Sequence, residues 1–220
     1  MNTLNEAFGI IMKDGDKILK LTLEHIYMSF SGVLLAILLG VPIAIFMTKY
    51  RNLADLIQNI IGMIQTIPSI ALLLIIMIFF GLGYTTAIVA LVFYSLLPII
   101  QNTYAGLSNV DRNLIEAGTG MGMTYTQLLF KVKIPLAFPV MMAGFRIATI
   151  IAIGVTTIAT FVGAGGLGEM IYRGIATTDD AKVLAGSIPA ALLAVCVDFI
   201  LKMIEKRAGF NRHKKRLKSS

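Results

Sequence analysis

The chain has 220 residues, of which 57% are hydrophobic and only 14% are charged, with a formal net charge of +7. Soluble domains carry about 25% charged residues, so this composition excludes an ordinary soluble protein and favours one that lies in a membrane. The single cysteine, Cys196, excludes an internal disulfide framework. The positive charge gathers near the C-terminus behind an apolar segment, which indicates contact with anionic lipid rather than with nucleic acid.

The first segment, residues 1–20, is interrupted by acidic and basic residues and is therefore not a cleavable signal sequence. Its apolar residues recur at roughly helical spacing: Leu4, Phe8, Ile11, Met12, Ile18 and Leu19. We expect a short amphipathic helix that lies on the membrane surface, although Gly9 and Gly15 weaken its helix propensity.

Apolar segments long enough to cross a bilayer, about 20 residues each, follow along the chain. They are predicted at 26–48, 56–80, 85–104, 136–162 and 183–203, and a break at 81–84 separates the second from the third. Each contains a proline: Pro42, Pro68, Pro98, Pro139 and Pro189. These prolines either bend the helices around a transport path or only shape their packing. The predicted fold class is an all-α integral membrane protein with five transmembrane helices.

The basic residues predict how these helices are oriented. With five spans, the termini lie on opposite sides of the membrane. If the C-terminus is cytoplasmic, 13 of the 19 Lys and Arg residues face the cytoplasm, five lie outside, and Arg146 lies within a span. The positive-inside rule therefore predicts an external N-terminus and a cytoplasmic C-terminus. We divide the chain into an N-terminal amphipathic segment (1–20), a transmembrane domain (21–205) and a basic cytoplasmic tail (206–220).

A polar segment at about 105–135 separates the third and fourth spans, and we expect it to form two short helices at an angle. The first is predicted at 113–121, with Asp111 or Asn113 as its cap. Gly120 and Gly122 then allow a turn.

The second short helix is predicted to start at Thr124, because Thr124-x-x-Gln127 is a capping-box pattern. Leu128, Leu129 and Val132 give this helix an apolar face. Pro135 is expected to stop it before the fourth span.

The same segment contains Glu116-Ala117-Gly118-(x)3-Gly122-(x)9-Val132-Lys133-Ile134-Pro135. This pattern resembles the cytoplasmic "EAA" loop of ABC-importer permeases, with Gly118 in place of the second alanine. The resemblance implies that residues 111–135 are a coupling loop that docks onto a separate ATPase subunit. It assigns that contact to Glu116, Ala117, Gly118, Gly122, Val132, Ile134 and Pro135.

Other segments, Gln65–Leu72, Leu96–Thr103 and Gly163–Gly168, extend the resemblance to the osmoprotectant group of these permeases, which take up glycine betaine, carnitine or choline. It implies a type I importer in a bacterial cell membrane. Two permease subunits, identical or different, would form the path, two ATP-binding subunits would use ATP and Mg²⁺, and an extracellular protein would deliver the solute. A methionine-like amino-acid permease is the alternative.

Enzymatic interpretations find little support in the sequence. Gly163–Gly168 satisfies G-x-G-x-x-G but lacks the βαβ context of a dinucleotide site, so we expect a tight external turn or a partial helix break. No P-loop is present, and no metal site is expected from His25 and the distant His213. We therefore expect no cofactor in this chain. A gradient-driven transporter is a less favoured alternative, since no internal repeat is visible.

Three isolated polar residues leave alternatives open. Arg146 either lines the substrate path or, as we prefer, pairs with acids or carbonyls near the cytoplasmic loop. Asp198 is placed near the cytoplasmic end of the fifth span or at a subunit interface, and His25 at the outer membrane interface. Some aromatic residues either belong to the membrane-edge belts or line a path for a quaternary ammonium ion: Tyr27, Tyr84, Phe93, Tyr94 and Tyr104.

Overall fold

The computed structural model describes residues 2–216, and these residues are almost entirely helical with no strand among them. Met1 and the last four residues of the predicted basic tail, 217–220, lie outside the described part. The helices are α1 (Asn2–Lys13), α2 (Gly15–Lys49), α3 (Arg51–Thr66), α4 (Ser69–Phe80), α5 (Tyr84–Ser108), α6 (Arg112–Gly120), α7 (Tyr125–Leu128), α8 (Ile134–Thr156), α9 (Gly168–Ala176) and α10 (Asp180–Arg216). A π-helical turn, η1 (Leu129–Lys133), precedes α8, and a 3₁₀ turn, η2 (Ala159–Val162), follows it.

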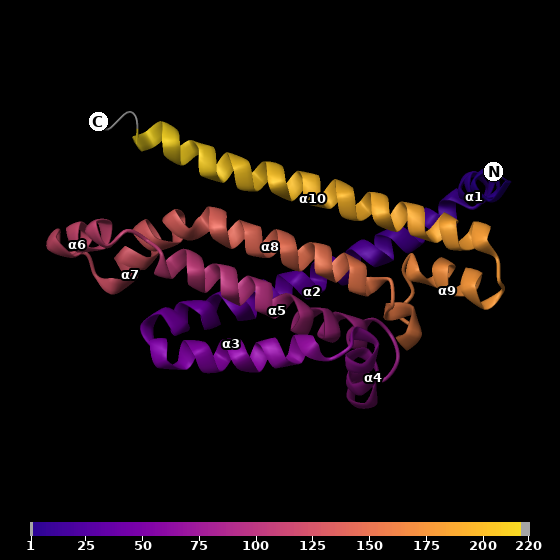
Figure 1. Ribbon diagram of the computed structural model, residues 1–220, viewed down its shortest axis with the longest axis horizontal. Helices are drawn as coiled ribbons and strands as arrows, with labels where there is room; N and C mark the ends of the chain where they lie inside the picture. The colour runs from indigo at the N-terminus through magenta and orange to yellow at the C-terminus, as the bar shows by residue number, and fades with distance from the viewer. Residues whose placement is uncertain (1, 217–220) are drawn as a thin grey trace.

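The predicted all-α membrane fold is confirmed. Among the described residues, four helices are long and apolar enough to cross a membrane, and the bent pair α3–α4 makes a fifth if it is counted as one span. The long helices run roughly alongside one another (Figure 1). One end carries α6 and α7, which we call the coupling end, and the C-terminus lies on the same side (Figure 1). The opposite end carries α9 and the N-terminus, and we call it the turn end (Figure 1).

The centre of the bundle is formed by α2, α5 and α8, with α5 packed against both of the others. Glycines bring these helices close together. A Cβ atom at Gly32 would lie 2.6 Å from the Cβ atom of Leu91, and one at Gly144 would lie 2.6 Å from that of Asn102. Because lipid supplies no hydrophobic drive between apolar helices, such close packing is a principal source of their association.

The second predicted span, 56–80, is not one straight helix. α3 and α4 meet at an angle of 98° across Ile67 and Pro68. Proline disfavours helical geometry in the preceding residue, and Ile67 is extended, with φ −69° and ψ 128°. The Tyr94 hydroxyl on α5 donates to the Ile67 carbonyl, and the Gln65 side-chain amide donates to the Tyr94 carbonyl at 2.8 Å. The Tyr94 side chain thus provides a partner for the Ile67 carbonyl at the break.

The N-terminal helix packs against the first part of α10. This helix begins at Asp180 and continues to Arg216, so part of the predicted tail extends the helix of the predicted fifth span. α1 packs against α10 and places Ile10 and Ile11 against a buried cluster that includes Leu167 and Ala185. The placement of α1 on a membrane surface stays a prediction.

Candidate functional site

The coupling elbow, residues 111–135, begins with a capped helix. The Asp111 carboxylate accepts the backbone N–H of Asn113 at 3.0 Å, which confirms the predicted cap of α6. At the other end, the N–H groups of Gly122 and Met123 bond to the carbonyls of Thr119 and Gly118. This is a Schellman ending, in which Gly122 takes the left-handed conformation with φ +77°. The predicted turn at Gly122 is therefore confirmed.

Gly118 is the position at which the sequence departs from the Glu-Ala-Ala pattern, and it is the buried residue of α6. A Cβ atom there would lie 2.7 Å from Cδ1 of Leu128 and 3.3 Å from the Met123 sulfur. The missing methyl group therefore makes room for Leu128, which packs the second arm of the elbow against the first.

The second arm starts with the predicted capping box. The Thr124 hydroxyl accepts the Gln127 N–H at 3.3 Å, and the Gln127 side chain accepts the Thr124 N–H at 3.0 Å. α7 then passes through η1 into α8, so the helix runs from Tyr125 to Thr156 without interruption.

The expectation that Pro135 stops this helix is wrong. The π-helical turn extends the hydrogen bond of Ile134 by one residue, to the carbonyl of Leu129. Pro135 follows in the first turn of α8, where the shifted hydrogen-bond pattern of the π-helical turn accommodates its missing N–H group and the helix continues. The second arm is therefore a direct extension of a membrane helix.

The predicted coupling residues divide into two groups. Glu116 and Ala117 are exposed on α6, together with Gly122 at the turn and Pro135. Gly118 is buried, and Val132 and Ile134 are partly buried. The structure also places exposed apolar side chains on the elbow that the sequence analysis did not single out: Leu114, Met121, Tyr125 and Phe130. The sequence signal that could have identified these side chains is that each apolar residue stands isolated among polar ones.

The inward face of the elbow is anchored in the membrane helices. Leu129 belongs to a buried cluster with Leu107 on α5 and with Ala137 and Met141 on α8. The elbow is thus packed on α5 and α8, and its outer face is left open.

Arg146 on α8 pairs with acids on α10, which confirms the predicted pairing of this charge, while its nearness to a cytoplasmic loop stays a prediction. Its guanidinium lies 3.6 Å from the Asp198 carboxylate and 3.3 Å from that of Glu205. Sequence reasoning did not name Glu205, because only the packing of α8 on α10 brings the two side chains together.

At the turn end, Gly163, Gly165 and Gly166 all have positive φ, so the predicted tight turn is confirmed. The Glu24 carboxylate accepts the Gly166 N–H at 3.2 Å. His25 is fully buried, with its Nε2 atom 3.0 Å from the Ile153 carbonyl oxygen, so its side chain faces neither lipid nor water, and its position at the outer membrane interface stays a prediction. The ring is buried because Gly166 has no side chain and the turn closes over the imidazole ring.

Comparisons with known proteins agree with this architecture. Residues 32–209 match the family described as "Binding-protein-dependent transport system inner membrane component". The chain is 44% identical to the glycine betaine/carnitine/choline transport system permease protein OpuCD of Bacillus subtilis (strain 168), over 98% of this chain and 94% of that protein. It is 42% identical to the carnitine transport permease protein OpuCD of Listeria monocytogenes serotype 1/2a (strain 10403S), over 98% and 97%.

Solved structures show the same fold. An inward-facing structure of the MetNI methionine ABC transporter aligns with a TM-score of 0.76 at 25% identity, covering 87% of this chain and 95% of that one. An amino acid ABC transporter with histidines aligns with a TM-score of 0.73 at 20% identity, covering 90% and 96%. The family match covers most of the chain, and the relatives are similar along nearly their whole length. The chain therefore belongs to the family of inner-membrane components of binding-protein-dependent transport systems.

Proposed function

We propose that the chain is the permease subunit of an ATP-driven importer for trimethylammonium osmoprotectants, namely glycine betaine, carnitine or choline. The names of its relatives support this solute class, because permeases 42–44% identical to the chain are named for these compounds. The amino-acid alternative is supported by the fold of the methionine transporter, at only 25% identity.

The observation that carries the transport mechanism is the uninterrupted helix from Tyr125 to Thr156. A partner that pushes on α7 would move α8 with it, because no flexible joint separates them. We assign the docking surface to the exposed face of the elbow around Glu116, Ala117 and Gly122, with Gly118, Val132, Ile134 and Pro135 holding its shape. ATP and Mg²⁺ would be bound by the partner, which supplies the nucleotide chemistry.

We place the coupling end in the cytoplasm and the turn end outside. The supporting argument is that 12 of the 13 basic residues assigned to the inside by sequence lie in the described part of the chain, and these fall in the coupling-end parts of α2, α3, α6, η1 and α10. In this orientation the N-terminus is external, two ATP-binding subunits reach the elbows of two permease subunits, and an extracellular binding protein meets the turn end.

The docking role is tested by substitutions at Gly122. No atom lies within 4 Å of a Cβ atom there, so a small side chain has room, whereas a tryptophan adds the strain of a bulky residue at φ +77° and projects a ring toward a partner. Gly122→Asn is the matched control, because asparagine tolerates the left-handed conformation and is small. We expect Gly122→Trp to lower ATP-driven uptake about tenfold and Gly122→Asn to retain most of it.

The measurement is uptake of radiolabelled glycine betaine, carnitine and choline by proteoliposomes that contain the permease, its ATPase and its binding protein. Glu116→Arg should uncouple uptake from ATP hydrolysis in the same assay. Normal uptake by both Gly122→Trp and Glu116→Arg would refute the docking assignment, and no uptake of the three solutes by the wild type would refute the solute class.

A further inference from the structure

A cavity of about 420 Å³ opens at the turn end of the bundle, away from the coupling elbow. Residues from four separate segments line it: Glu24 on α2, Tyr84 on α5, Thr160 on η2, and Glu169, Tyr172 and Arg173 on α9, with Gly163–Gly165 as its floor. A trimethylammonium group is smaller than this volume, so the cavity has room for it together with water.

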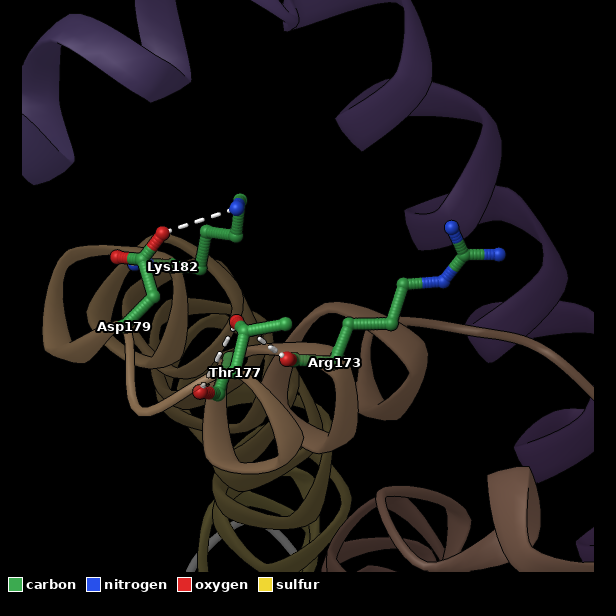
Figure 2. A network of polar contacts seen from close by, with 5 residues as sticks. Arg173, Thr177, Asp179 and Lys182 are labelled. Atoms are coloured by element: carbon green, nitrogen blue, oxygen red, sulfur yellow. Dashed lines mark hydrogen bonds and ion pairs between the residues drawn. The ribbon is translucent and has the colours of Figure 1, made fainter.

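The charges around the cavity leave an excess of one negative charge. Glu169 forms an ion pair with Arg173 at 2.8 Å. The Arg173 guanidinium extends away from the neighbouring ion pair of Asp179 and Lys182, as Figure 2 shows. Glu24 has no Lys or Arg partner among the ion pairs of the described residues. Its carboxylate is therefore the group that attracts a cation.

Two tyrosine rings face the same cavity, each held by a second aromatic ring. Tyr84 makes a T-shaped contact with Tyr27 at 6.3 Å between ring centroids, and Tyr172 makes one with Phe161 at 5.2 Å. Tyr84 and Tyr172 keep 42% and 46% of their surface exposed. Exposed aromatic rings that line the same cavity as a carboxylate are the chemistry that recognises quaternary ammonium ions.

Gly165 keeps these groups together. A Cβ atom at this position would lie 2.7 Å from the Glu24 carboxylate oxygen Oε2 and 3.8 Å from the Tyr84 hydroxyl. A side chain would therefore displace the carboxylate. The left-handed conformation of Gly165, with φ +76°, adds a second reason for glycine.

We propose that this cavity binds the trimethylammonium head group of the solute at the turn end of the permease, with Glu24 as the counter-charge and Tyr84 and Tyr172 as the aromatic walls. This inference rests on the proposed function, because it assumes that the transported solutes carry such a head group. It goes further by assigning recognition of the head group to the permease itself.

The test is direct binding to the purified permease–ATPase complex in lipid nanodiscs, measured by saturation-transfer NMR without ATP. The probes are choline and 3,3-dimethyl-1-butanol, which has the same shape without the charge. The wild type should bind choline more tightly than the neutral isostere. Glu24→Gln and Tyr172→Leu should each weaken choline binding about tenfold, whereas Tyr172→Phe, which keeps the ring, should bind like the wild type.

Equal choline affinity in wild type, Glu24→Gln and Tyr172→Leu would overturn the proposal, and so would equal binding of choline and the isostere. If Tyr172→Leu lowers only the amount of inserted protein and leaves choline affinity unchanged, the tyrosines belong to the membrane-edge belt. This result would also overturn the proposal. If Glu24→Gln does not fold, Tyr84→Leu tests the same site. Failure of the proposed function is seen separately, as absence of solute uptake by the wild-type complex with ATP and binding protein.

Discussion

The Nε atom of Arg146 on α8 lies 3.3 Å from the Oε2 atom of Glu205 on α10, and both atoms are buried. The contact is an ion pair without hydrogen-bond alignment, and neither atom has another hydrogen-bond partner among the described residues. Asp198 shares the same guanidinium at 3.6 Å. Two carboxylates therefore depend on one cation, which connects the helix that extends into the elbow with the longest helix of the bundle.

We expect Arg146→Met to destabilise the protein by about 2 kcal/mol, less than the loss of a fully buried pair, because the side chains are 24–40% exposed. The cause is two uncompensated carboxylates on α10. The triple variant Arg146→Met/Asp198→Asn/Glu205→Gln removes those charges and should recover at least half of the loss in a thermal-unfolding assay in detergent. No recovery would mean that packing of the arginine stem, and not charge, is responsible.

The contact between Gly118 and Leu128 predicts a compensating pair of substitutions. Gly118→Val should cost about 1–3 kcal/mol, because its side chain would overlap Leu128 in the elbow. Adding Leu128→Ala should restore part of that stability. Gly120→Val is the matched control, since nothing lies within 4 Å of a Cβ atom there. Equal effects at Gly118 and Gly120 in thermal unfolding would contradict the close contact.

Gly168 is predicted to tolerate no side chain. A Cβ atom at this position would lie 1.9 Å from the carbonyl oxygen of Thr157, which is backbone and cannot rotate away. Gly168→Ala should therefore cost about 4 kcal/mol or more and lower the amount of folded protein in the membrane. Gly154→Ala makes the same change in open space on α8 and should be neutral or stabilising by up to about 1 kcal/mol. Size-exclusion profiles of the two variants provide the comparison.

Thr178 is the one non-glycine residue with positive φ in the described part of the chain, at 53°. It follows α9 in a Schellman ending, since the N–H groups of Thr178 and Asp179 bond to the carbonyls of Ile175 and Gly174. Thr178→Gly should stabilise the protein by about 1 kcal/mol, because glycine takes this conformation without strain.

The neighbouring residue Thr177 provides the control for Thr178→Gly. The Thr177 hydroxyl donates to the Arg173 carbonyl at 2.9 Å, as Figure 2 shows, and its φ is −103°. Thr177→Gly should therefore destabilise. A rise in melting temperature for Thr177→Gly, or a fall for Thr178→Gly, would refute the strain argument.

The Asp179 carboxyl group, which lies outside the predicted membrane spans, should make the stability of the protein depend on pH. Hydrogen bonds from the Lys182 side chain and backbone N–H lower the pKa of its carboxyl group. A lowered pKa in the folded state means that the stabilisation is complete above the ordinary aspartate pKa of about 3.9 and is lost as pH falls through the lowered value. Wild type should therefore be more stable than Asp179→Asn at neutral pH, and the two melting temperatures should converge below about pH 4. A constant difference at all pH values would contradict this.

Features that depend on residues close together in the chain could be predicted from the amino-acid sequence. Long apolar runs predicted helices that suit a membrane, because each helix satisfies its own backbone hydrogen bonds. The Asp111 cap, the Thr124–Gln127 capping box and the Gly122 turn were also predicted, since each involves groups no more than five residues apart. For the same reason the coupling elbow could be outlined before its contacts were known.

Which of the prolines breaks its helix depends on contacts between helices. Pro42, Pro98, Pro139 and Pro189 lie inside continuous helices, whereas Pro68 separates two helices at 98°. Each of these prolines lacks a backbone N–H group, so this property alone does not explain the difference. The break at Pro68 coincides with a hydrogen bond from the Tyr94 hydroxyl, which is distant in sequence and reaches the open carbonyl of Ile67 from another helix.

The burial of His25, the pairing of Arg146 with Glu205 and the cavity beside Glu24 have the same origin. In each case the contacting group belongs to another segment of the chain. The order of residues along the sequence does not show how close two such groups lie in space. Local hydrogen bonds and hydrophobicity thus set the helices, and packing between helices set where their polar groups meet.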